Sequence, residues 1–381
     1  MKKKKIGILT LFYHNYNYGG VLQAYALQKK IELLGYDSKQ ISYDIKTGYI
    51  KKSNKIKRFL RPIKKFYIFF KDYRWNLVSI KIKNKIKSFT NSIPHTEVVN
   101  VQTIKELNNY FDVFICGSDQ IWNPIGYQPT LMLSFVDNDK IKIAYAASIA
   151  KEKLEENELD FICKYISDFK TISIREPNDI NRIQNKTGKK VKIMPDPTLI
   201  IEPKYYEKIL SARLMDEEYI LAYFLGNNEE QKNEVIKYAQ LQNKKIVFIP
   251  FVNRKSLEWD LKNKNKINDA IGIKEFLSLI YYSSLVITDS FHGAVFSILF
   301  NKNFLVLDRF KENDKISMNS RLDNLLKRFG LESRRKKVFN AEQFIYEQIS
   351  NEEKNNINKI LSEERKKADK YLKEALNYEN E

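Results

Sequence analysis

Short apolar runs alternate with longer amphipathic stretches along most of this chain of 381 residues. Ile6–Phe12 is predicted to be a strand, because its residues are mostly apolar and a polar, glycine-containing loop follows. After Gly19 and Gly20, apolar residues recur at helical spacing over residues 21–34, and Gly35 ends the helix. Further strands are predicted at residues 41–43, 112–118, 142–148, 171–176 and 191–196. This alternation predicts a parallel sheet with helices on both faces.

The same pattern starts again near residue 218. Strands are predicted in "EYILAYFLG", "KKIVFIP", "SLVITDS" and "FLVLD", with helices between them at about 274–283 and from about 292. The pattern therefore predicts an α/β fold with two domains, at residues 1–200 and 201–340, joined around 198–217. Residues 341–381 are charged, helical in period and free of Gly and Pro, so they predict terminal helices, one of which could pack back across the first domain.

Composition agrees with two folded domains, because the length exceeds one ordinary core and hydrophobic residues make up 43% of the chain. Cys116 and Cys163 lie in apolar surroundings without a CxxC pattern, which favours buried thiols in a reducing compartment. The three histidines, His14, His95 and His292, have no cysteine or carboxylate partners at ligand spacing. We therefore expect no metal site and no cofactor.

The start of the chain is basic and then apolar, as in a signal peptide, but the apolar run is short and lacks a small-residue cleavage site. We interpret it as the first strand behind a basic start. No apolar stretch approaches the roughly 20 residues that span a bilayer. The prediction is a cytoplasmic protein, at most peripheral to the inner face of the membrane.

Residues 46–90 carry 15 Lys and Arg and a single acid, Asp72, which is most of the net charge of +19. Seven of the aromatic residues among them are Phe59, Phe66, Tyr67, Phe69, Phe70, Tyr73 and Trp75. This mixture is typical of a segment that contacts an anionic membrane or acceptor. A helical insertion with packed aromatics and solvated lysines fits equally well. Nucleic acid is a weaker alternative, because no nucleic-acid-binding motif accompanies the charge, and we expect no nucleic-acid partner.

Four strand ends carry residues that could do chemistry, because ligands of open α/β sheets gather where strands end. The first junction, "HNYNYGGVLQAYAL", offers polar groups and glycines that allow close approach of a ligand, although a tight turn explains it equally well. The second, "CGSDQIWNP", offers a carboxylate, amides and an indole, which suit sugar hydroxyls and faces, or alternatively a cap. The predicted acceptor-binding residues are His14, Asn17, Tyr18, Gly19, Ser118, Asp119, Gln120, Trp122 and Asn123.

The other two junctions suit an anion. Arg175 in "SIREPND" either pairs with Glu176 or offers its planar fork to a phosphate or carboxylate. In "ITDSFHGAVFSILFN", His292 stands at the start of a helix whose free N–H groups attract anions, and its imidazole could donate to a phosphate or move a proton. A histidine that merely caps the helix is the alternative. The candidates for binding this anion are Arg175, Ser290, Phe291, His292 and Gly293.

Together these stretches resemble the polysaccharide pyruvyl transferase family. The matching segments run in order from about residue 6 to 330. They are "NYGGVLQAYAL", "ICGSDQIWNP", "YAAS", "SIREPND", "MPDPT", "EFLSLIYYSSLVITDSFHGAVFSILFNKNFLVLD" and "NSRLDNLL".

The resemblance implies two Rossmann-like domains that face each other across a cleft, the first binding the acceptor and the second the donor, similar to the domains of GT-B glycosyltransferases. It implies a transferase that takes phosphoenolpyruvate as donor and makes a cyclic ketal on two hydroxyls of a sugar, in the synthesis of cell-surface polysaccharide. The acceptor could be lipid-linked. The donor-site histidine of the family falls on His292 and its arginine on Arg175, with Phe291 binding through its backbone. Asp119, or less plausibly Asp289, is the candidate base toward the acceptor, so His292, Arg175 and Asp119 are the predicted catalytic residues.

Two other functions stay open at this point. A GT-B glycosyltransferase that uses a nucleotide-sugar would need an acidic pair late in the second domain, for which Asp308 and Glu312 are the nearest candidates. A non-enzymatic scaffold would not need His292 or Arg175.

Overall fold

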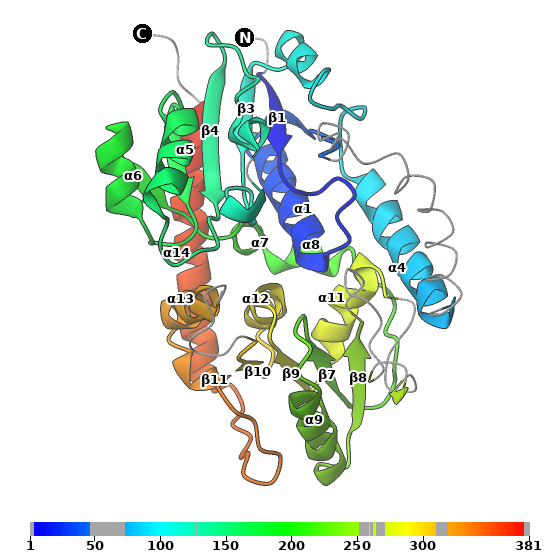
Figure 1. Cartoon of the computed structure of the whole chain (residues 1–381). Helices are drawn as coiled ribbons and strands as arrows, with labels where there is room; N and C mark the ends of the chain where they lie inside the picture. Colours follow the sequence, from blue (N-terminus) through cyan, green and yellow to red (C-terminus); the bar gives the residue numbers. More distant parts are fainter. Residues whose placement is uncertain are drawn as a thin grey trace, which may run out of the picture.

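The computed structural model describes residues 4–45, 73–126, 128–250, 259, 262–263, 271–309 and 319–376. These residues form two α/β domains, one above the other in Figure 1, each built around its own sheet. The predicted fold class of two Rossmann-like domains is confirmed, because strands alternate with helices in both domains and every strand pair is parallel.

The first domain holds a six-stranded sheet in the order β2-β1-β3-β4-β5-β6. Its strands are β1 (Lys5–Leu9), β2 (Asp37–Gln40), β3 (Val113–Cys116), β4 (Ile141–Ala147), β5 (Thr171–Ile174) and β6 (Val191–Ile193). Its helices are α1 (Tyr18–Leu33), α4 (Tyr73–Ser92), α5 (Glu156–Ile166) and α6 (Ile180–Thr187). The central strands β3 and β4 are buried at every position except Ile141, as expected of a parallel sheet covered on both faces.

The second domain holds a five-stranded sheet in the order β11-β10-β9-β7-β8. Its strands are β7 (Tyr219–Tyr223), β8 (Lys245–Ile249), β9 (Leu285–Thr288), β10 (Phe304–Leu307) and β11 (Arg335–Lys336). Its helices are α9 (Glu229–Leu241), α11 (Ile273–Tyr282), α12 (Phe291–Leu299) and α13 (Asn319–Phe329). Short 3₁₀ helices elsewhere in the described chain lie at Ile104–Asn109, Pro124–Gly126, Pro129–Met132 and Glu332–Arg334.

Strand β2 differs from the sequence prediction, which placed a strand at residues 41–43. The strand lies at Asp37–Gln40 and consists of polar residues. Gln40 is buried because its amide donates to the Ala24 carbonyl, and Ser38 is buried against the amide of Gln28. These hydrogen bonds let a polar edge strand pack under α1, and hydrophobic pattern alone cannot show them.

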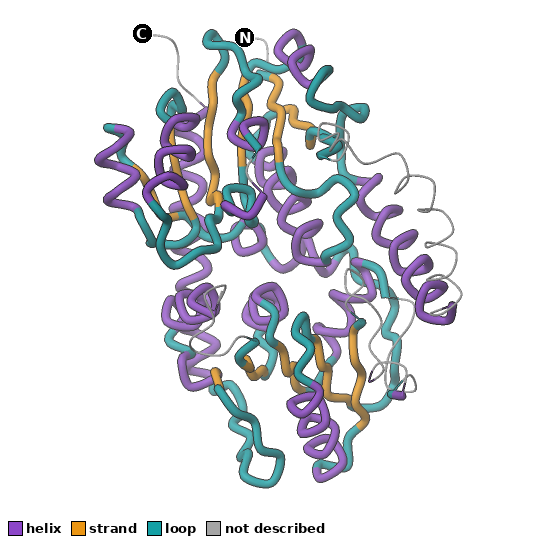
Figure 2. The backbone as a smooth tube through the Cα atoms, viewed as in Figure 1, coloured by secondary structure: helices purple, strands orange, loops and turns teal. Residues whose placement is uncertain are grey.

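Two connections tie the domains together. The chain passes from the first domain to the second through α7 (Pro197–Ile200) and α8 (Pro203–Glu207). It returns through α14 (Asn351–Leu376), whose Leu361 packs with the second-domain core and whose Leu372 packs with the first. The loop that precedes α14 is drawn in teal in Figure 2, so the prediction of helix from residue 341 is wrong for residues 341–350.

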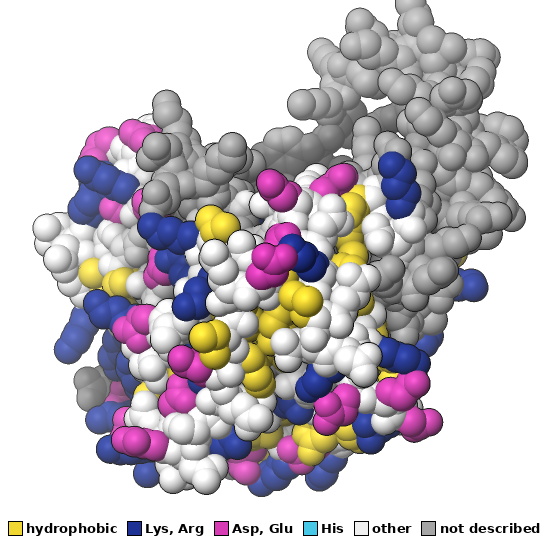
Figure 3. All heavy atoms as spheres, turned by 90° about the horizontal axis from the view of Figure 1, so that it is seen from below, with side chains coloured by type: hydrophobic (Ala, Val, Ile, Leu, Met, Phe, Trp, Pro, Cys, Tyr) yellow, Lys and Arg dark blue, Asp and Glu magenta, His cyan; other side chains and the backbone are white. Residues whose placement is uncertain are grey.

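Helix α4 is the described part of the basic segment 46–90, and residues 46–72 lie outside the described residues. Its apolar side chains Ile82, Ile86 and Phe89 are buried in the same core as α1, α11 and α12. For these residues the structure favours the packed insertion over a membrane-facing helix. Within the described chain, no helix is both long and apolar enough to cross a membrane. On the face shown in Figure 3, basic and acidic side chains are interspersed.

Candidate active site

The strand orders place the junctions between β1 and β3 and between β7 and β9 at the points where ligands of such sheets bind. Helix α1 follows β1 and α12 follows β9, and the two helices contact each other between the domains. His292, in the first turn of α12, lies directly over Gly19 of α1. A Cβ atom on Gly19 would come within 2.0 Å of the His292 Nδ1 atom, so only glycine fits beneath this imidazole. The first turn of α1 and the first turn of α12 therefore meet at the contact between the domains.

The start of α12 is shaped by its own hydrogen bonds. Ser290 is the N-cap and its hydroxyl accepts from the Gly293 amide at 3.3 Å. The Thr288 hydroxyl accepts from the Ser290 amide at 3.0 Å and donates to the Tyr223 carbonyl at 2.6 Å. A Cβ atom on Gly293 would come within 2.5 Å of that hydroxyl. The Ser290 side chain and Gly293 thus hold the turn that presents His292.

Asp196 is the point where the two domains' charged groups converge. Its Oδ2 atom accepts from Nη1 of Arg175 at 2.6 Å and lies 3.7 Å from Nε2 of His292. Its Oδ1 atom accepts from the amide and hydroxyl of Thr198, in the first turn of α7. Burial alone would raise the pKa of the Asp196 carboxyl, but His292, Arg175 and Thr198 together hold that pKa well below its usual range. Asp196 is therefore ionised at neutral pH and faces a histidine and an arginine at once.

Arg175 is buried at the end of β5, where it was predicted to meet an anion. Its Nε atom donates to Glu176 at 3.0 Å, and its guanidinium carbon lies 4.7 Å from the centre of the Phe291 ring. Burial opposes the charge, but Glu176 and Asp196 raise the pKa of Arg175 above its ordinary value. Among the described residues, no acceptor lies within hydrogen-bonding distance of Nη2 of Arg175 or Nε2 of His292. Both atoms are available to a bound anion.

Arg321 of α13 also belongs to this cluster, although the sequence analysis gave it no role. Its guanidinium carbon lies 5.1 Å from the centre of the Phe291 ring, so Phe291 contacts two arginines. Its Nε atom is 3.7 Å from Glu176, and its Nη2 atom is 4.0 Å from Asp119. Burial and repulsion from Arg175 lower the pKa of Arg321 to about 10, so it stays charged at neutral pH. The only sequence signal that could have pointed to Arg321 was its place in the "NSRLDNLL" motif.

The space among these groups is small. A cavity of about 20 Å³ is lined by residues of both domains, including Arg175, Asp196, Phe291 and Arg321. A volume of this size accommodates about one water molecule. A ligand larger than a water molecule therefore needs the side chains or the domains to move apart before it binds here.

Three predicted acceptor-binding residues are in the core, which corrects those predictions. Tyr18 donates its hydroxyl to the Ile271 carbonyl and stacks on Phe276, with ring centres 4.7 Å apart. Ser118 is buried and donates to the Ala146 carbonyl. Trp122 is 0% exposed and packs edge-on against Phe169, so no sugar face can reach its ring. The residues after a strand end can point back into the core, and their position in sequence does not reveal it.

The remaining predicted acceptor residues are divided between capping roles and accessible positions. Asn17 is the N-cap of α1, where its side chain accepts from the Gly19 and Gly20 amides, and Gly19 lies under His292. Asp119 is partly exposed, 4.0 Å from Arg321, and has a left-handed backbone with φ 51°. The Asn123 amide donates to the Gln120 side chain near it.

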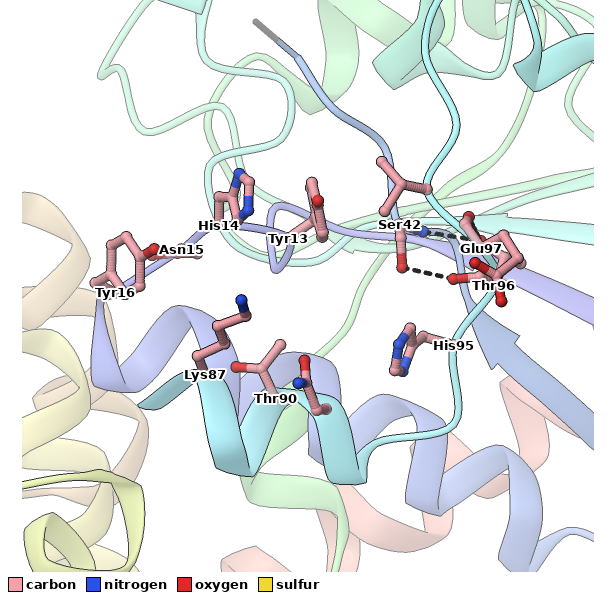
Figure 4. Close-up of a pocket in the computed structure, with 12 residues that line it drawn as sticks. Tyr13, His14, Asn15, Tyr16, Ser42, Lys87, Thr90, His95, Thr96 and Glu97 are labelled. Carbon is pink, nitrogen blue, oxygen red and sulfur yellow. Dashed lines mark hydrogen bonds between the residues drawn. The ribbon is translucent and has the colours of Figure 1, made fainter. Parts of the chain in front are cut away.

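His14 is exposed and lies apart from the buried cluster, in a pocket of about 250 Å³ in the first domain (Figure 4).

The acidic residues considered for other roles have structural partners. Asp289 accepts from the amides of Leu225 and Gly226 at 2.6 and 2.7 Å, which ties β9 to the end of β7 and leaves it poorly suited as a base. Asp308 accepts from Arg335. Glu312 lies outside the described residues.

Fold and site together are those of a two-domain α/β protein with a cluster of arginine, histidine and carboxylate groups between its domains. The family model for polysaccharide pyruvyl transferase matches residues 17–309, which include every residue of this cluster except Arg321. The chain belongs to the polysaccharide pyruvyl transferase family, a family of transferase enzymes.

Other comparisons give more distant similarity. A search of curated proteins finds no match. Among solved structures, the chain is similar to UDP-GlcNAc 2-epimerase from Methanocaldococcus jannaschii, with 12% identity, a TM-score of 0.48 and 94% and 92% of the two chains covered. It is also similar to a glycosyltransferase from Rickettsia africae, with 12% identity, a TM-score of 0.48 and 100% of both chains covered. An alpha-glucosyltransferase in complex with UDP and DNA has 10% identity and a TM-score of 0.48, with 99% and 100% covered.

Proposed function

We propose that this protein transfers the pyruvyl group of phosphoenolpyruvate to two hydroxyls of a saccharide, forming a cyclic ketal and releasing phosphate. The convergence of Arg175 and His292 on Asp196 carries the proposal, because it brings a guanidinium of the first domain and an imidazole of the second together at the start of α12. Phosphoenolpyruvate carries a phosphate and a carboxylate, and such a cluster suits both. Arg321 adds a further charge beside Phe291.

The proposed reaction forms two C–O bonds at C2 of phosphoenolpyruvate and breaks the bond between C2 and the phosphate oxygen. A proton adds to the methylene carbon, which becomes the methyl group, and the first acceptor hydroxyl attacks C2. Phosphate then leaves and the second hydroxyl attacks. Of the two hydroxyl protons, one balances the proton added to carbon and the other departs with phosphate.

Each residue of the cluster has a proposed task in this reaction. Arg175, through its Nη2 atom, and Arg321 hold the donor anion. His292 donates to the leaving phosphate or relays a proton through Nε2, a contribution typically worth about 10²–10⁴-fold in rate. Asp196 positions both His292 and Arg175 without touching the donor. Asp119, partly exposed beside Arg321, is the proposed base toward the acceptor hydroxyl.

Titration with phosphoenolpyruvate, followed by calorimetry, tests the proposal. We expect His292→Gln and Arg175→Lys each to weaken donor binding by about tenfold or more, since each removes a charge-assisted hydrogen bond. Arg182→Gln, which alters an ion-paired arginine on α6, is the matched control and should bind normally. Phosphate release from phosphoenolpyruvate should depend on an added saccharide. Unchanged donor binding in both site variants, or consumption of a nucleotide-sugar instead, contradicts the proposal.

A further inference from the structure

The pocket shown in Figure 4 lies in the first domain, outside the buried cluster. The loop between β1 and α1 forms one wall, with Tyr13, His14 and Tyr16. The last turns of α4 form the floor, with Lys87 and Thr90, and the segment after α4 forms the opposite wall, with His95. The pocket holds about 250 Å³ and is located at the carboxyl ends of β1 and β2, the edge of the sheet where ligands of this fold class bind.

The walls of this pocket are held in place by hydrogen bonds. The segment with His95 runs alongside β2, because Gln40 donates to the Pro94 carbonyl and Thr96 donates to the Gln40 carbonyl. The Ser42 hydroxyl donates to the Thr96 carbonyl at 3.0 Å. On the other side, the Asn15 side chain accepts from the Asn17 amide at 2.8 Å. A pocket with such walls is formed before a ligand arrives, which lowers the entropic cost of binding.

The lining suits a sugar ring. Tyr13 and Tyr16 supply aromatic surface, and Lys87 and Glu97 supply a donor and an acceptor of opposite charge. The Nδ1 atom of His95 lies 2.7 Å from the Ile93 carbonyl, so this nitrogen carries the hydrogen and Nε2 can accept one from a hydroxyl. In Figure 4, the Lys87 ammonium points into the pocket toward His14.

Size separates this pocket from the buried cluster. The cluster surrounds about 20 Å³ and sets Arg175 and Arg321 against Glu176 and Asp196, whereas the pocket holds about 250 Å³ and is lined by one lysine and one carboxylate. A free phosphate gains little selectivity from such a balanced lining. A ring of hydroxyls gains both donors and acceptors, together with an aromatic contact.

The same loop connects the pocket to the donor site. Tyr16 lines the pocket, and Gly19, three residues further on, lies under the His292 imidazole. Three residues span at most about 11 Å between Cα atoms. The pocket wall at Tyr16 is therefore close along the chain to the residue beneath His292, and under this proposal the acceptor extends from the pocket toward His292.

We propose that this pocket of the first domain, between the β1–α1 loop and α4, binds a pyranose ring of the saccharide acceptor. This proposal rests on the proposed function in one respect, that the bound saccharide is the acceptor of the reaction. Whether the pocket binds a sugar is tested separately. Under this proposal, the acceptor site is lined by residues of α4 and of the segment after it. Tyr18, Ser118 and Trp122 do not belong to it, because they are in the core.

Saturation-transfer NMR of the full-length protein tests the pocket. The probes are methyl β-galactoside, methyl β-glucoside, methyl α-mannoside and N-acetylglucosamine, each at millimolar concentration and without donor. At least one should receive saturation from the protein, and Lys87→Gln and His95→Leu should each weaken its binding about tenfold. Lys81→Gln is the matched control, since Lys81 is exposed on the same helix and does not line the pocket.

The outcomes distinguish this proposal from the proposed function. Sugar binding that Lys87→Gln weakens and Lys81→Gln leaves intact supports the pocket, even if phosphoenolpyruvate does not bind. Sugar binding that neither Lys87→Gln nor His95→Leu weakens overturns the pocket, even if phosphoenolpyruvate binds beside His292. The absence of saturation transfer to all four sugars also overturns it.

Discussion

The interface between the two domains has two halves of different chemistry. In the apolar half, α1 and α4 pack against α11 and α12, with Tyr18 stacked on Phe276 and Ile86 buried beside them. In the ionic half, Arg175, Asp196 and Arg321 gather around Phe291. The apolar half buries surface without directional requirements, whereas the ionic half satisfies buried charges only in one arrangement.

The difference indicates which half serves stability and which serves function. Replacing buried ion pairs by apolar residues of similar volume is often neutral or stabilising, so the ionic half is poorly explained as a stabilising device. The unpartnered Nη2 atom of Arg175 and the unpartnered Nε2 atom of His292 point to a ligand instead. The apolar half fixes how the domains meet, and His292 lies at the boundary, over Gly19.

The largest effect is expected from Arg175→Gln, which breaks the ionic half. It leaves the carboxylates of Asp196 and Glu176 buried without their main partner, which should lower the free energy of unfolding by about 3–5 kcal/mol. Urea unfolding measures the change. Adding Asp196→Asn should recover part of the loss because the buried charge is removed. A loss below about 1 kcal/mol would mean that the pair is effectively exposed to solvent.

Ile86→Ala tests the apolar half. Ile86 is 0% exposed within the shared core, so its truncation should cost about 2–5 kcal/mol in the free energy of unfolding. The affinity for phosphoenolpyruvate of the protein that remains folded should stay close to that of the parent. Urea unfolding and donor titration check the two parts. A large loss of donor affinity would show that the two halves are not independent.

Gly19→Ala tests the boundary between the halves. The added Cβ would meet the Nδ1 atom of His292 at 2.0 Å, so the imidazole has to move. We expect a cost of about 1–3 kcal/mol in the free energy of unfolding from overpacking. Under the proposed function, donor binding should weaken as in His292→Gln. The double variant Gly19→Ala/His292→Gln should weaken it little further, and additive losses would argue against this explanation.

Lowering the pH should destabilise the ionic half of the interface more than the apolar half. The folded-state pKa of Asp196 is depressed, so the stability that it contributes is present above its unfolded pKa of about 3.9 and is lost as pH falls further. The loss can reach about 1.4 kcal/mol for each pH unit below that value. Unfolding free energies measured between pH 6 and pH 3 should therefore fall less steeply in Asp196→Asn than in the parent. If the unfolding free energy fell equally steeply with pH in both proteins, the conclusion that Asp196 is stabilised as a carboxylate in the folded state would be contradicted.

The sequence predicted the elements that carry strong periodicity and failed where the role of a residue depends on tertiary contacts. The β9–α12 junction was predicted because an apolar strand, a polar turn and an apolar helix follow one another. Strand β2 was misplaced because its polar residues are buried by specific hydrogen bonds.

The candidate site, like the fold, was predicted only in part. Arg175 and His292 were identified from strand ends and from the family resemblance, and the structure brings both to Asp196. Asp196 and Arg321 were not assigned roles, because their importance depends on contacts with residues far away in sequence, which the sequence alone does not show. Trp122 was misjudged, since sequence does not show that its ring turns into the core.

The smallest effect is expected from Lys85→Gln, which removes a charged contact at the edge of the apolar half. The Lys85 ammonium lies 2.5 Å from Glu275 of α11, but the lysine side chain is 43% exposed. Exposed ion pairs of this kind contribute about 0.2–1 kcal/mol, because solvent screens them and two long side chains must be ordered. The change in the free energy of unfolding should therefore stay below about 1 kcal/mol, well under that of Ile86→Ala, and should shrink further in high salt. If Lys85→Gln destabilised the protein as much as Ile86→Ala does, α4 would be held to the second domain by charge, and the division into an apolar and an ionic half would have to be abandoned.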